Sequence, residues 1–123
     1  MEYIVKTIAH EGKCFDFSFE FDPSNEALTL FLLDDFPEFT AFYLSAIDKV
    51  LRGESKKEEL TGNSSSVEFG PENTKIENLF PPDENESATC VVNTKELRQV
   101  MDEWLARRKE FREKQNAQKE GNK

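Results

Sequence analysis

Residues 14–21 read CFDFSFEF, and this strict alternation is the strongest constraint on what the chain can fold into. Every second position is aromatic: Phe15, Phe17, Phe19 and Phe21. Successive side chains of a β-strand point to opposite faces, so the pattern predicts a half-buried antiparallel strand. Four such rings could instead form a ligand-binding wall. With 11 phenylalanines among 123 residues, however, we expect them to fill the core.

Three other segments have the composition of strands. Residues 3–10 (YIVKTIAH) are β-branched and aromatic, and a turn sequence separates them from residues 14–21. Residues 88–93 (ATCVVN) are similar. Residues 26–33 (EALTLFLL) form an apolar run that periodicity cannot assign to a strand or to a short helix. We interpret this run as a strand.

The stretch GNSSSVEFGPENTKIENLF begins like a linker, but it continues as two runs of strand length separated by turn-forming residues. Glycine, proline and asparagine favour a turn there for different reasons: a free φ, a fixed φ and a side chain that bonds to the backbone. We therefore predict a hairpin that pairs residues 64–69 with residues 75–80. In this hairpin Val67 and Phe69 share one face, Ile76 lies opposite them on the partner strand, and Glu68 points outward.

A first helix is predicted over residues 36–52, where apolar residues recur at spacings of three and four. Asp35 stands where a cap is needed, and Gly53 can adopt the left-handed geometry that ends many helices. The charged segment 54–60 (ESKKEEL) follows as a connection.

A second helix is predicted after residue 93, because Asn93 and Glu96 have the spacing of a capping box. Its apolar residues form one stripe: Leu97, Val100, Met101, Trp104, Leu105 and Phe111. A stripe with this spacing is usually part of the core. The alternative is that Trp104, Met101 and Phe111 form an exposed groove for a partner.

The expected order is β-β-(β)-α-β-β-β-α, an α+β fold in which both helices pack on one face of an antiparallel sheet. The other face of the sheet is then open to solvent and rich in acidic residues. The chain is too short for two ordinary domains, so residues 1–114 form one domain. Residues 115–123 lack an apolar anchor and are expected to form a disordered tail.

Negative charge is concentrated in the first three quarters of the chain. Residues 1–93 contain 19 acidic and 7 basic residues, a net charge of −12, whereas residues 94–123 have a net charge of +3. An acidic surface of this kind argues against a nucleic-acid partner, because a protein that binds nucleic acid needs cations on its contact face. It favours a basic protein partner. Solubility is the simpler explanation of the same charge.

Catalytic and metal-binding patterns are weak in this sequence. The single histidine, His10, could form a dyad with Cys14, but no third orienting group is evident. Asp34, Asp35 and Glu38 could hold a hard cation, although acids at a helix start have an electrostatic reason of their own. The cluster Arg107-Arg108-Lys109 with Arg112 is interspersed with acids and is expected to be solvated. We expect no enzyme activity, no cofactor and no metal.

The start of the sequence shows no signal segment, and no apolar run approaches 18 residues. We therefore expect no contact with membranes and a cytoplasmic protein with reduced thiols.

The second half of the chain carries a diffuse pattern of short motifs. They are Gly62-Asn63, Val67-Glu68-Phe69, Glu72-Asn73-Thr74-Lys75-Ile76, Cys90, Thr94-Lys95-Glu96-Leu97 and Trp104. This pattern, over residues 45–108, resembles the small acidic bacterial immunity proteins, the antitoxins of contact-dependent growth inhibition and related polymorphic toxin systems.

The resemblance implies a non-enzymatic inhibitor that binds a cognate toxin domain and blocks its active site or substrate channel. Such toxins are often basic nucleases, which fits the acidic body. Contact residues vary among these proteins, so charge and position must select them. The candidates are Asp34, Asp35, Glu38, Glu68, Glu72, Glu77, Asp83, Glu84 and Glu86. The alternative function is that of a small cytosolic adaptor or structural binding module with no toxin partner.

Overall fold

The computed structural model describes the backbone of residues 1–10, 13–81 and 88–121, and the side chains of residues 1–8, 16–81 and 88–114. The elements in chain order are β1 (Ile4–His10), β2 (Lys13–Glu20), η1 (Pro23–Asn25), α1 (Glu26–Leu30), η2 (Phe31–Asp35), α2 (Thr40–Leu51), β3 (Glu58–Thr61), β4 (Ser65–Phe69), β5 (Asn73–Asn78), β6 (Thr89–Asn93) and α3 (Thr94–Gly121).

The α+β fold class is confirmed, but the strands form two antiparallel sheets. β1 and β2 form a separate hairpin, and the other strands form a sheet with the order β3-β4-β5-β6. The predicted β4–β5 hairpin is present, and its register pairs Val67 with Ile76 and Phe69 with Thr74. Alternate residues of β4 and β5 are buried, because α1, α2 and α3 cover one face of the four-stranded sheet. The opposite face is open.

The strand predicted over residues 26–33 is wrong, because this run is helical. Residues 26–30 form α1, and residues 31–35 continue it as the π-helical turn η2. Ala27, Leu28, Phe31 and Leu32 are buried, and this spacing lies on one side of a helix, whereas a strand would bury every second residue. A short apolar run does not contain enough periods to distinguish the two.

The predicted helix 36–52 begins later than expected. α2 starts at Thr40, and Asp35 does not cap it. The end of the helix is confirmed: Gly53 has a φ of 78°, and the amide of Glu54 donates to the carbonyl of Lys49 at 2.9 Å. With the bond from the Gly53 amide to the Val50 carbonyl, this is a Schellman motif.

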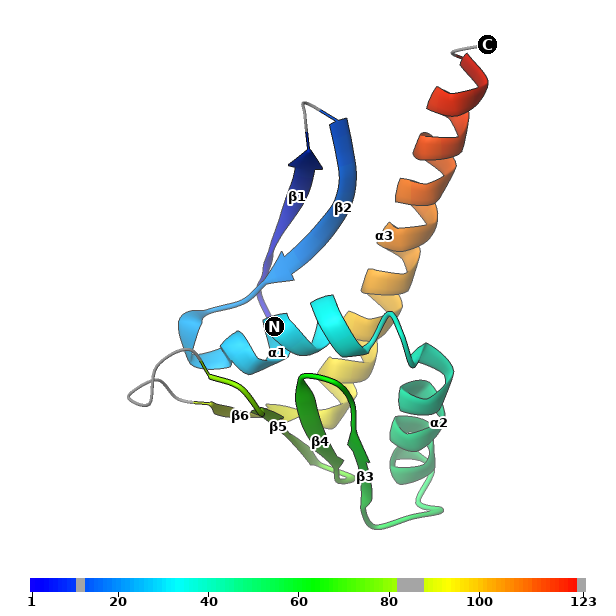
Figure 1. Ribbon diagram of the computed structural model, residues 1–123. Coiled ribbons are helices and arrows are strands. Elements are labelled where there is room, and N and C mark those ends of the chain that lie inside the picture. The colour runs from blue at the N-terminus through cyan, green and yellow to red at the C-terminus, as the bar shows by residue number, and fades with distance from the viewer. Residues whose placement is uncertain (11–12, 82–87, 122–123) are drawn as a thin grey trace.

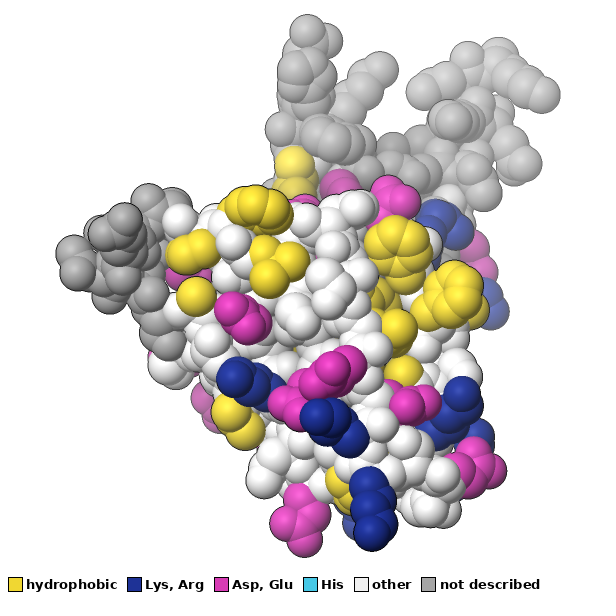
Figure 2. Space-filling model, turned by 60° about the horizontal axis from the view of Figure 1, so that its bottom comes forward, with side chains coloured by type: hydrophobic (Ala, Val, Ile, Leu, Met, Phe, Trp, Pro, Cys, Tyr) yellow, Lys and Arg dark blue, Asp and Glu magenta, His cyan; other side chains and the backbone are white. Residues whose placement is uncertain are grey.

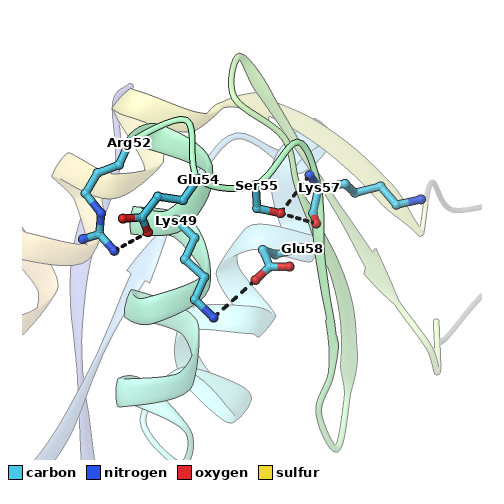
Figure 3. Close-up of polar contacts among 6 residues, drawn as sticks. All are labelled: Lys49, Arg52, Glu54, Ser55, Lys57 and Glu58. Carbon is cyan, nitrogen blue, oxygen red and sulfur yellow. Dashed lines mark hydrogen bonds and ion pairs between the residues drawn. The ribbon is translucent and has the colours of Figure 1, made fainter.

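The segment predicted as a charged connection contains an additional strand, β3. Figure 3 shows how polar contacts hold the chain between α2 and this strand. Lys49 pairs with Glu58 at 3.7 Å and Arg52 with Glu54 at 3.0 Å. The Ser55 hydroxyl donates to the carbonyl of Lys57 at 2.9 Å. β3 was missed because its charged residues lie at the edge of the sheet and only Leu60 shows the apolar character of a strand.

The β1–β2 hairpin packs against α3, and both extend to the same side of the molecule (Figure 1). Phe17 and Phe19 are buried, as the alternation predicts. The Phe17 ring lies 5.5 Å from that of Trp104 and 5.7 Å from that of Phe111. Aromatic packing therefore attaches the hairpin to the helix.

α3 starts as predicted. The side-chain oxygen of Asn93 accepts a hydrogen bond from the Glu96 amide at 3.0 Å. Leu97, Val100 and Met101 are buried on one face. The helix backbone runs to Gly121, past the position at 115 where we expected a tail to begin.

Candidate functional site

Asp35, a predicted contact residue, is fully buried. It ends the turn η2, and its carboxylate accepts four hydrogen bonds from backbone amides in the loop between β3 and β4. Asn63 donates to Oδ1 at 2.9 Å, Ser65 donates to Oδ2 at 2.8 Å, and Ser64 reaches both oxygens at 3.2 Å. The assignment of Asp35 to a partner surface is therefore corrected: burial withdraws its charge from the surface, and its role is to hold the loop.

Gly62 allows this close approach. A Cβ atom at position 62 would lie 2.5 Å from the Asp35 carboxyl group and 2.8 Å from the Tyr43 hydroxyl. Burial, together with the nearby charge of Asp35, raises the pKa of Tyr43 to about 12. The loop, the turn and α2 thus meet at one closely packed point.

Asp34 and Glu38, the neighbouring predicted acids, are exposed and line a groove of about 340 Å³ between β2, η2 and α3. We call this the α3 groove. Its lining residues are Asp16, Phe17, Leu32, Leu33, Asp34, Pro37, Glu38, Trp104, Arg108, Phe111 and Arg112. The sequence allowed two roles for Trp104 and Phe111, packing in the core or forming a groove for a partner. The structure gives them both roles, because they pack on the core and also border the groove.

The α3 groove has acidic and basic walls. Asp34 and Glu38 stand on the η2 side, and Arg108 and Arg112 stand on α3, one turn apart. The Arg108 guanidinium carbon lies 5.4 Å from the centre of the Trp104 ring. Partial burial, followed by repulsion from Arg112, lowers the pKa of Arg108, and Asp16 opposes this effect. Among the side chains that the structure describes, no ion pair joins the two walls.

Glu68 and Glu77 lie on the open face of the four-stranded sheet, as their outward position predicts. Glu59 of β3 lies beside Glu68 in the register. Lys57 pairs with Glu59 and with Glu68, each at 3.3 Å, and these contacts raise the pKa of Lys57. The side of the molecule brought forward in Figure 2 shows acidic and basic side chains close together, with apolar groups among them.

The predicted acids therefore fall into separate groups. Glu72 is exposed in the turn between β4 and β5, near the open face. Asp83, Glu84 and Glu86 lie outside the described residues. The structure brings Asp34 and Glu38 together at the α3 groove, on the helical side of the sheet, and Glu68 and Glu77 together on its open face.

Sequence reasoning missed the basic wall of the α3 groove. Arg108 follows Trp104 by four residues and precedes Arg112 by four, a spacing that places all three side chains along one helix face. This spacing was visible in the sequence. The acidic residues near these arginines nevertheless favoured the interpretation of a solvated helix face. Asp16 and Glu59 were also missed, because their neighbours across the groove and the sheet depend on the fold.

Comparisons with known proteins found no match: no protein-family model, no curated protein and no solved structure is similar to this chain. In the part of the chain that the structure describes, no group of three His, Cys, Asp or Glu side chains could hold a metal ion. Within the same residues, every helix is too short or too polar to cross a lipid bilayer.

Replacing the buried carboxylate should be strongly destabilising. Asp35→Ala leaves the amides of residues 63–65 without their acceptor, so we expect the free energy of unfolding to fall by about 3–5 kcal/mol. Asp34→Ala, at the exposed neighbour, should cost less than about 1 kcal/mol, because it removes only a contact with the Ser64 hydroxyl. Urea unfolding of both variants measures the difference, and equal effects would contradict the structural role of Asp35.

Stability at alkaline pH should depend on Tyr43. Its pKa in the folded protein, about 12, is above the value of about 10 for an unfolded tyrosine, so its neutral form favours folding. This contribution is complete below pH 10 and is lost as the pH rises to 12. Between these limits the free energy of unfolding of Tyr43→Phe should decline less steeply than that of the wild type, by about 2–3 kcal/mol in total. Tyr3→Phe is the comparison: burial and a hydrogen bond to Glu103 also raise the pKa of the more exposed Tyr3, so this variant should change the slope in the same direction but by less.

Proposed function

We propose that this protein is a cytoplasmic immunity protein that binds and neutralises a cognate toxin domain. The observation that carries the proposal is the open face of the four-stranded sheet, where the carboxylates of Glu59, Glu68 and Glu77 lie among Lys57 and Lys75, with Glu72 in the adjoining turn. Glu72 and Glu77 have no ion-pair partner among the described residues. Unpaired carboxylates on a broad face attract a basic surface and accelerate its association.

The same charges explain how such a protein inhibits without catalysis. A nuclease binds the phosphates of its substrate with clustered lysine and arginine side chains. Carboxylates that cover those side chains compete with the substrate, and a bound protein also blocks access to the active site. Val91, which is 61% exposed on the open face, supplies an apolar contact among the charges. Inhibition of this kind needs no cofactor and no metal.

Co-expression tests the function directly. The partner to test is the C-terminal domain of the large effector that the immunity function predicts in the neighbouring upstream gene. We expect that domain alone to arrest growth, and we expect this protein to restore growth and to purify with it as a stable 1:1 complex. Growth arrest without rescue, together with no complex, would refute the immunity function and favour an adaptor.

Charge reversal tests the face. In Glu68→Lys/Glu72→Lys/Glu77→Lys the attraction becomes repulsion, so we expect the Kd for the toxin domain to rise at least about tenfold and its dependence on salt to become weaker. The matched control is Glu2→Lys/Glu26→Lys/Glu113→Lys, which makes the same change in net charge at exposed positions outside the four-stranded sheet. Calorimetry that finds the two triple variants equally affected would show that only net charge matters, not this face.

A further inference from the structure

Two pairs of like charges line the α3 groove, together with the single carboxylate of Asp16, which attracts Arg108 without forming an ion pair with it. Asp34 and Glu38 form one pair, and Arg108 and Arg112 form the other. Each pair repels itself, and within the described side chains neither arginine forms an ion pair with a carboxylate. A ligand that brings an ammonium or guanidinium group to one wall and a carboxylate to the other relieves both repulsions.

Between these walls the groove has a small apolar floor, because Phe17 and Trp104 are almost fully buried and the accessible apolar surface comes from the half-buried Leu33, Pro37 and Phe111. The Phe17 and Trp104 rings pack against each other beneath it, and Phe111 lies next to Phe17. Water over such a surface is released favourably when an apolar group replaces it. The middle of the groove therefore suits an apolar side chain, and the Arg108 guanidinium over Trp104 borders this site.

Size and charge together select the class of ligand. A groove of about 340 Å³ is at the small end of ligand sites, and it suits a few amino-acid residues. The carboxylates of Asp34 and Glu38 repel a phosphate chain, and the arginines repel a purely basic peptide. A segment in which a basic and an acidic side chain flank an apolar one can place each charge beside the wall of opposite sign. Neither wall then repels it.

We propose that the α3 groove binds a polypeptide segment in which a basic and an acidic side chain flank an apolar one, and that the toxin domain presents this segment. This inference rests on the proposed immunity function. The open sheet face then supplies general attraction for a basic toxin, whereas the groove distinguishes the cognate toxin from others of similar charge.

Trp104 provides a direct readout, because it is the single tryptophan of the chain and is only 5% exposed at the groove. Protein labelled with 5-fluorotryptophan has one fluorine resonance, which a toxin domain without the label does not obscure. We expect this resonance to shift when the toxin domain binds. A complex that forms without any shift would overturn the groove assignment and leave the immunity function intact.

Charge reversals on the two walls test the same contact by affinity. Glu38→Lys and Arg112→Glu change exposed side chains, so the fold should tolerate both. Each should raise the Kd for the toxin domain at least about fivefold. Glu26→Lys and Lys109→Glu are matched controls outside the groove and should change the Kd less than about twofold. Groove variants that bind as tightly as the controls would refute the proposal.

Short peptides test whether the groove binds a mixed-charge segment in the absence of the toxin domain. Acetylated and amidated Lys-Leu-Glu and Glu-Leu-Lys should shift the Trp104 resonance at millimolar concentration, whereas Lys-Leu-Lys and Glu-Leu-Glu should not. Mixed-charge peptides that shift the resonance, combined with a toxin domain that does not bind, would support the peptide site and refute its toxin source. Equal shifts with all four peptides would show that charge does not select the ligand, and absence of any shift with the mixed-charge peptides would reject the peptide class.

Discussion

The carboxylate of Asp35, held by three successive backbone amides, is the interaction on which the arrangement of the molecule depends. It attaches the loop between β3 and β4 to the end of the turn η2. These segments belong to different layers, so the contact fixes the β3–β4 end of the four-stranded sheet against the helices. Gly62 and Tyr43 complete the contact, since any side chain at position 62 would collide with the carboxyl group.

This arrangement divides the surface into two regions of different character. With the helices on one face, the other face of the sheet remains available and displays its charges around an open hollow of about 330 Å³ that Lys57, Glu68, Lys75 and Val91 help to line. On the helical side, the junction of the β1–β2 hairpin, η2 and α3 forms a defined groove with opposed charges. Broad charge suits rapid and general attraction, whereas a small groove with fixed charge positions suits selection.

The fold class and most strands were predictable because alternation is a local property. The burial of Phe17 and Phe19 in the first hairpin and of Val67 and Phe69 in β4 follows directly from it. The candidate site was predictable only in part. Asp34 and Asp35 are adjacent acids of the same type, yet one is exposed and the other is buried. Nothing in their local sequence distinguishes them, because the difference comes from a loop almost thirty residues away.

By itself, the sequence determined the periodic elements, the end of α2 at Gly53 and the concentration of negative charge in the first 93 residues. These features depend on neighbours within a few positions along the chain. The tertiary structure alone decided that residues 26–33 are helical, that Asp35 is internal and that Arg108 faces acids across a groove. Each of these outcomes depends on contacts between segments distant in sequence, and the free energy of such contacts exceeds the weak local preferences of short apolar or charged runs.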